Sequence, residues 1–157
     1  MPPGSDRAAV PDLPVRFRPL GVRIALIVGG VLLIVLIAVM WFALPQGMRD
    51  RFTLFQGITL LLMAGLIFAL MYGVARCRID ARTDGITVIN GYRARTFAWS
   101  QVLGVHLPAG APWARLDLSD GTTLAAVGIQ GSDGPRAHAQ VRQLRALIEK
   151  HGQATAE

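Results

Sequence analysis

The chain has 157 residues, of which 52% are hydrophobic and 17% are charged, and its net charge is +6. Charged residues usually make up about a quarter of a soluble domain, so this composition argues against an ordinary soluble protein. The basic residues are spread thinly, which excludes the dense basic arm of a nucleic-acid-binding protein. A single cysteine, Cys77, excludes an internal disulfide and a multi-cysteine zinc site.

Residues 1–21 form a segment rich in proline and arginine. Within it, residues 14–19 alternate apolar and basic side chains between two prolines, a pattern typical of an edge strand, where a missing donor is tolerated. Val15 and Phe17 would then cover the apolar face of a sheet. The alternative is a proline-rich tail, and residues 1–13 are expected to be disordered in either case.

Two apolar runs follow, and residues 22–44 and 53–75 are expected to form membrane-spanning helices. The first run contains 21 consecutive uncharged residues, from Ile24 to Leu44. A helix of that length is about 30 Å long, which matches the hydrocarbon core of a bilayer. Because backbone groups in that core must be paired within the segment, each span must be helical.

The short loop between the two runs predicts an antiparallel hairpin over residues 22–75. Arginines near the ends of spans favour the cytoplasmic side, and they are more numerous outside the hairpin than in its loop. They are Arg16, Arg18 and Arg23 before the first span, Arg76, Arg78 and Arg82 after the second, and Arg49 and Arg51 in the loop. The expected location is the plasma membrane, with both termini cytoplasmic.

Glycines in the spans predict close helix packing. Gly57, Gly65 and Gly73 recur in the second span, and Gly29 and Gly30 lie in the first. Small residues let helices approach closely, so the glycines indicate packing of the two spans against each other or, alternatively, a homo-oligomer. No ionisable residue lies deep in either span, which argues against an ion or proton pathway.

Residues 76–152 have the pattern of a small antiparallel β domain. Apolar and polar residues alternate in short runs that are separated by turn sequences, notably Asp84-Gly85, Asn90-Gly91 and Asp120-Gly121. The expected strands cover residues 77–82, 86–89, 93–99, 102–107, 113–118 and 122–127. The N-terminal segment would make a seventh strand.

One amphipathic helix is expected after the strands. Ser132–Pro135 is a typical start, with a capping residue before a proline, and Gly152 is expected to cap the end. The apolar face of the helix should cover the sheet and pack near a buried Trp99. That face consists of Ala137, Val141, Leu144 and Ile148. Residues 153–157 are expected to be a disordered tail.

Two of the strand sequences resemble bacterial pleckstrin-homology (PH) domains. Asp84–Val88 has the form Asp-Gly-Ile-x-Val, and Phe97–Val102 places tryptophan and valine as in the strand that follows in that family. The resemblance implies a PH-like fold, so the fold class is an α+β membrane protein. It would combine a two-helix transmembrane hairpin with a PH-like antiparallel domain of six or seven strands and one C-terminal helix.

A narrower resemblance lies in Pro112–Leu124, with Ile129 and Gln130 after it. This stretch is similar to the PH domain-containing, low molecular weight protein antigen 6 type of high-GC Gram-positive bacteria. The likeness covers roughly residues 17–150 and implies two N-terminal spans. It supplies no catalytic residues to carry over.

The histidines do not form a catalytic or metal-binding pattern. His106 is expected at a strand end, and His138 and His151 are expected to be solvated on the helix, so no two share metal-ligand spacing. No cofactor and no metal are expected, and we interpret the protein as not an enzyme.

The candidate site residues are four arginines. Arg93 and Arg95 would project from one face of a strand and could hold a phosphate together. Arg76 and Arg78 lie close to the second span, where anionic lipids attract basic side chains. Two interpretations stay open: contact with anionic headgroups, or a solvated strand edge that charge keeps from pairing.

The leading functional interpretation is a membrane-tethered PH-like interaction module at the cytoplasmic face, which binds an unidentified protein partner at the inner membrane. Tethering raises the effective concentration of partners in the same bilayer. The alternative is a domain that binds or senses anionic phospholipids. Nucleic acid is not an expected partner.

Overall fold

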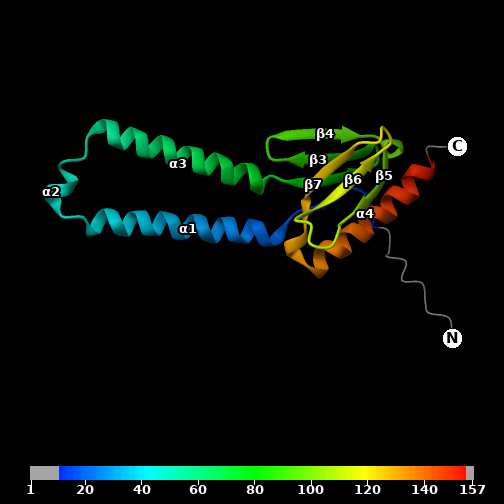
Figure 1. The fold of residues 1–157 in the computed structure, drawn as a ribbon, viewed down its shortest axis with the longest axis horizontal. Coiled ribbons are helices and arrows are strands. Elements are labelled where there is room, and N and C mark those ends of the chain that lie inside the picture. The colour runs from blue at the N-terminus through cyan, green and yellow to red at the C-terminus, as the bar shows by residue number, and fades with distance from the viewer. Residues whose placement is uncertain (1–10, 155–157) are drawn as a thin grey trace. The chain divides into compact units, whose positions relative to one another are not determined.

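A computed structural model describes residues 11–154 of the chain. These residues divide into two compact units (Figure 1). One unit is helical and consists of residues 21–75. The other joins residues 11–20 to residues 76–154 and contains all the strands. Of the segments expected to be disordered, residues 1–10 and 155–157 lie outside the described residues, whereas Leu13 packs partly buried against the core of the β domain.

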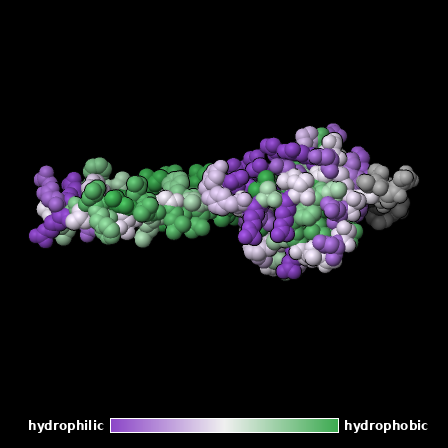
Figure 2. Space-filling model, turned by 90° about the horizontal axis from the view of Figure 1, so that it is seen from above, coloured by the Kyte–Doolittle hydropathy of each residue, from purple (hydrophilic) through white to green (hydrophobic). Residues whose placement is uncertain are grey.

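The helical unit contains the two apolar helices that the sequence predicts. Helix α1 covers Leu20–Ala43 and α3 covers Leu54–Ala75, within two residues of the expected ends. Both are long and apolar enough to cross a membrane, and almost none of their side chains is buried in the protein. Their surface is accordingly hydrophobic over most of its length (Figure 2).

The connection between these helices contains one short helix that the sequence analysis missed, α2 at Gln46–Arg49. Arg49 Nε donates a hydrogen bond to the carbonyl oxygen of Leu44 at 2.9 Å. At the start of α3, the Gln56 side chain accepts a hydrogen bond from the Thr53 N–H at 3.0 Å, and Thr53 Oγ1 accepts one from the Gln56 N–H. These bonds pair polar groups at the helix ends, which lack partners within the helix.

Among residues 11–154, seven strands form two antiparallel sheets. The first sheet has the order β1-β2-β3-β4, and the second has the order β5-β6-β7. The first sheet comprises β1 (Val15–Phe17), β2 (Arg78–Arg82), β3 (Gly85–Asn90) and β4 (Arg93–Phe97). The second comprises β5 (Val102–His106), β6 (Trp113–Leu118) and β7 (Thr123–Gln130).

The N-terminal segment contributes the seventh strand. β1 pairs antiparallel with β2 at the edge of the first sheet, and Phe17 lies opposite Ile79. Phe17 is buried and Arg16 is exposed, as the alternation of the segment predicts. The strand interpretation of this segment is therefore correct, and the proline-rich tail is excluded for residues 15–17.

The two sheets come closest where β7 crosses β2 and β3. A Cβ atom on Gly128 would lie 2.7 Å from the backbone carbonyl carbon of Arg78, so only glycine fits there. Beside this crossing, Asn90 Nδ2 donates to the carbonyl oxygen of Ala125 at 2.6 Å, and Asn90 Oδ1 accepts from the N–H of Val127 at 3.2 Å. A single asparagine thus joins both sheets at the point of closest approach.

The C-terminal helix α4 covers Pro135–Ala154 and packs on the core. It follows a short 3₁₀ turn, η2 at Gly131–Asp133, and the Asp133 carboxylate accepts a hydrogen bond from the backbone N–H of Leu20 at 2.9 Å. The expected helix cap at Gly152 is wrong, and residues 153–154 are not a tail, because the helix continues through Ala154. Gly152 also lacks the left-handed backbone of a helix-ending glycine.

Trp99 is buried in the core, but it lies outside a strand. Strand β4 ends at Phe97, and Trp99 begins a 3₁₀ turn, η1 at Trp99–Gln101, because the chain leaves the first sheet here to enter the second. Its indole Nε1 donates to the carbonyl oxygen of Arg82 at 3.0 Å, and its ring stacks on His151 at 4.9 Å between centroids. His151 is therefore half-buried rather than solvated as expected.

Replacement of Trp99 by alanine should destabilise the β domain by about 3–5 kcal/mol, since it removes a buried aromatic ring and leaves a cavity. The total stability of a domain is about 5–15 kcal/mol. Amide hydrogen exchange of β2 and β6 in the detergent-purified protein measures the effect. Trp113→Ala is the matched control, because Trp113 is 39% exposed. Equal exchange rates in the two variants would contradict a core role for Trp99.

Candidate interaction surfaces

The histidines do not meet in one place. Among residues 11–154, no group of three or more His, Cys, Asp or Glu side chains is placed to hold a metal ion. His106 ends β5, as expected, and its Nδ1 lies 3.0 Å from Asp117 Oδ2 on the partially exposed face of the second sheet. His138 contacts the carbonyl oxygen of Gly134 at its own helix start. These contacts hold turns and strands together.

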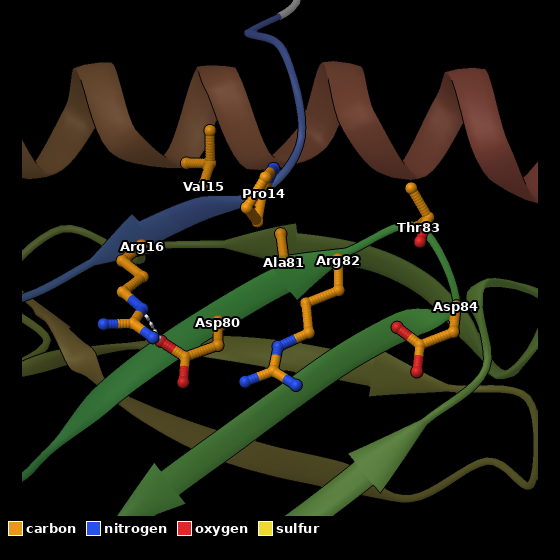
Figure 3. A pocket seen from close by; sticks show the side chains of 8 residues that line it. All are labelled: Pro14, Val15, Arg16, Asp80, Ala81, Arg82, Thr83 and Asp84. Atoms are coloured by element: carbon orange, nitrogen blue, oxygen red, sulfur yellow. Dashed lines mark ion pairs between the residues drawn. The ribbon is translucent and has the colours of Figure 1, made fainter.

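A cavity with a volume of about 780 Å³ lies along β1 and β2 in the β domain (Figure 3). The Asp80 side chain is 4% exposed, and Arg78 Nε donates to its Oδ2 at 3.0 Å. Arg16 Nε approaches Oδ1 from β1 at 3.4 Å, a distance at which charge attraction acts without a hydrogen bond. The remaining walls are Pro14, Val15, Ala81, Arg82, Thr83 and Asp84.

Sequence analysis missed this cluster around Asp80. The signal was present, because Arg78, Asp80 and Arg82 alternate along one strand and Arg16 lies on another. The decisive fact is the register, which places Arg16 directly opposite Asp80. This register joins β1 and β2, which the two apolar helices separate in the sequence, so local sequence patterns do not predict it.

The four predicted arginines are not gathered into one cluster. On β3, Ile89 pairs with Arg78, whereas the next residue, Asn90, pairs with Arg93. Since neighbouring residues of a strand face opposite ways, Arg78 and Arg93 lie on opposite faces of the sheet. Arg78 is also bound to Asp80. The sheet therefore separates Arg78 from Arg93 and Arg95, and anionic lipid contact by these arginines stays a prediction.

Two of these arginines lie near the first turn of the β3–β4 hairpin. The Arg76 guanidinium lies over the Tyr92 ring, 5.8 Å from its centroid, within the range of a cation–π contact. Tyr92 is exposed and directly precedes Arg93. Arg95 lies further along β4, and both β4 arginines are exposed. Arg76, Tyr92 and Arg93 thus form one end of the first sheet.

In the helical unit, glycines differ in what they face. A Cβ on Gly30 of α1 would lie 3.3 Å from Met71 Cε of α3, so this glycine lets the two helices approach. Gly29, Gly57 and Gly65 have no such neighbour within 4 Å. The packing that the sequence predicts between the spans is present at Gly30, and a homo-oligomer through the other glycines stays a prediction.

The comparison with known families concerns the β domain. Residues 76–147 match the family model of the bacterial PH domain. The chain contains a bacterial PH domain. Two sheets of antiparallel strands followed by a C-terminal helix agree with this fold. The matched region begins after β1 in the chain. The pairing of β1 with the domain is therefore known from the structure and not from the family match.

The curated relatives match about half of the chain. Uncharacterized proteins of Mycobacterium bovis and of two strains of Mycobacterium tuberculosis are 36% identical to it over 77 residues. The aligned region is 49% of this chain and 50% of each relative, so the chain spans about half the length of the curated relatives it matches. No solved structure matches the chain significantly.

The Asp80 cluster should hold β1 on the PH domain. Asp80→Asn removes the charge that attracts Arg16 and Arg78, and should weaken the pairing by about 1–2 kcal/mol, since hydrogen bonds to charged groups contribute more than neutral ones but exposed partners are screened. Amide exchange at residues 15–17 should accelerate. Asp84→Asn is the matched control, an exposed carboxylate of the same cavity. Unchanged exchange in Asp80→Asn would contradict this role.

Proposed function

We propose that this protein is a membrane-tethered interaction module, in which the hairpin of α1 and α3 spans the plasma membrane and the PH domain binds a protein partner at the cytoplasmic face. The observation that carries the proposal is the pairing of β1 with β2. These strands flank the two apolar helices in the sequence and belong to one domain. Both outer ends of the hairpin therefore start from the same side of the membrane.

The exposed apolar surface of the helices supports insertion. Side chains along α1 and α3 are leucine, isoleucine, valine, methionine and phenylalanine with large exposed fractions, which water disfavours and lipid does not. The excess of arginine outside the hairpin favours a cytoplasmic PH domain. A tether of this kind concentrates the domain near partners in the same membrane.

A binding role agrees with the family, because PH domains are typically non-enzymatic modules. We propose that this domain likewise binds and does not catalyse a reaction. The narrower likeness to the antigen 6 type, carried by Pro112–Leu124, supports a membrane protein of this architecture and stays a proposal.

Topology gives the first test. Reporter fusions after residue 20 and after residue 157 should both read cytoplasmic, and a fusion in the loop at Gly47 should read the opposite side. Gly47 has open space around it, so an insertion there should not disturb the hairpin. A cytoplasmic signal from Gly47, or an external one from residue 157, would contradict the proposed orientation.

The binding role needs a separate test. The intact protein is crosslinked in membranes, extracted in detergent and captured, beside a variant that lacks residues 83–157. A protein that accompanies the intact chain and is lost with the deletion supports the module. Trp99→Ala should also reduce its capture, because that change destabilises the domain and leaves the tether. A chain that crosslinks to nothing in a domain-dependent way would contradict the proposal.

Anionic phospholipid binding is the second candidate, and the contact of Arg76 with Tyr92 beside Arg93 favours it. Tyrosine and arginine are both favoured at membrane interfaces, and basic residues attract anionic lipids.

The lipid candidate predicts protection of residues 91–95 from amide exchange in nanodiscs with anionic lipid, compared with neutral lipid. Arg93→Glu should abolish the difference, and Arg115→Glu, on the exposed side of β6, should not. A difference that disappears at physiological salt would mean only general surface attraction.

A further inference from the structure

The outer edge of β4 is the most open strand edge of the PH domain. β4 pairs with β3 on one side, and no other strand among residues 11–154 pairs with it. Four of its five residues are exposed, and only Phe97 is partly buried. By contrast, the opposite edge strand, β1, is three residues long and is followed by buried Pro19, whereas α4 packs against β5 and β7 packs on the first sheet.

The hairpin geometry identifies the free backbone groups of this edge. Two residues, Gly91 and Tyr92, join Asn90 to its partner Arg93. In a two-residue hairpin the pair beside the loop is hydrogen-bonded, and bonded and non-bonded pairs then alternate. Arg93 and Arg95 consequently bond to β3, whereas Ala94 and Thr96 direct their N–H and C=O groups outward.

A side-chain contact agrees with this assignment. Thr87 and Thr96 lie opposite each other, and their hydroxyl oxygens are 3.1 Å apart. Side chains come closest in the non-bonded pairs of an antiparallel ladder. Thr96 therefore belongs to a non-bonded pair, and its backbone N–H and C=O groups are free to accept a further strand.

Charge restricts which strand can add to this edge. Arg93 and Arg95 are exposed and project from the same face of β4. An added strand would place its side chains about 4.5–5.5 Å from them, a distance at which opposite charges attract and like charges repel. Acidic residues at alternate positions of the incoming strand match both arginines.

A second copy of β4 meets like charge in both antiparallel registers that keep its two arginines within the pairing. Antiparallel pairing of two copies centred on Ala94 sets Arg93 against Arg95, and pairing centred on Arg95 sets that arginine against itself. Both registers oppose like charges, which destabilises a strand pair. The same arginines thus protect the edge from self-association and leave it open to an acidic strand.

We infer that the partner of this PH domain adds an extended acidic segment to the free edge of β4, with acidic side chains at alternate positions beside Arg93 and Arg95. The inference rests on the proposed function, since it names the surface and the chemistry of the partner. Backbone hydrogen bonds to Ala94 and Thr96 would provide the binding, and the two arginines would provide the selection.

The probe is a fluorescent peptide of alternating glutamate and valine, tested against the full-length protein in neutral detergent micelles by fluorescence anisotropy. Three comparison peptides are needed: one with lysine in place of glutamate, one with the same residues but adjacent glutamates, and one N-methylated at every second residue. The alternating acidic peptide should bind at least tenfold more tightly than each. N-methylation at the other set of positions should be tolerated, because only one set faces β4.

A charge swap supplies a test whose expected result cannot be produced by an unfolded domain. Arg93→Glu/Arg95→Glu should lose the acidic peptide and gain the lysine peptide, and a gain of binding requires a folded domain. Arg115→Glu/Arg142→Glu is the matched control, since both residues are exposed on other elements, and it should keep the original preference. Amide exchange should slow at Ala94 and Thr96 when the acidic peptide binds.

Equal binding of the acidic and lysine peptides, or indifference to N-methylation, would overturn the inference. So would protection of Ala94 and Thr96 by anionic nanodiscs with no effect of peptide, which would assign the arginines to lipid. The proposed function is tested separately. A crosslinked partner could be lost on deletion of residues 83–157 but still bind Arg93→Glu/Arg95→Glu. That result would support the interaction module and overturn the assignment of its binding surface to β4.

Discussion

The antiparallel pairing of β1 with β2 joins two segments that both apolar helices separate in the sequence. Burial of Phe17 in the core and the attraction between Arg16 and Asp80 hold this pairing together. Because the strands share one sheet, the chain must leave the domain and return to the same domain. The inferred topology of the chain depends on this one contact between strands.

Close approach of the two sheets is the second constraint on the PH domain. Gly128 lets β7 cross the backbone of β2, and Asn90 satisfies backbone groups of β7 from the end of β3. Buried polar backbone groups are costly when they lack partners, so an asparagine at this junction stabilises the crossing. The crossing covers one part of the first sheet and leaves β4 on its own at the far edge.

That free edge connects the fold to the proposed function. A solvent-exposed strand edge can pair with other chains, and charged side chains are a common protection against it. Arg93 and Arg95 provide that protection here and, by the same electrostatics, select for acidic partners. Arg76 directly follows α3 in the chain, and its contact with Tyr92 places it at one end of the first sheet. At that end, anionic lipid is the alternative ligand to an acidic protein segment.

Local sequence by itself determined the apolar helices, six of the strands, the C-terminal helix and the absence of a metal-ligand spacing, because these follow from periodicity and length over short windows. Local sequence does not fix where elements end: the strand predicted over residues 93–99 stops at Phe97, and the C-terminal helix continues past Gly152. The tertiary structure alone decided that β1 pairs with β2, that Arg16 meets Asp80, and that Arg78 and Arg93 face opposite ways. Each of these depends on strand register between distant segments, and a shift of one residue would reverse every side chain.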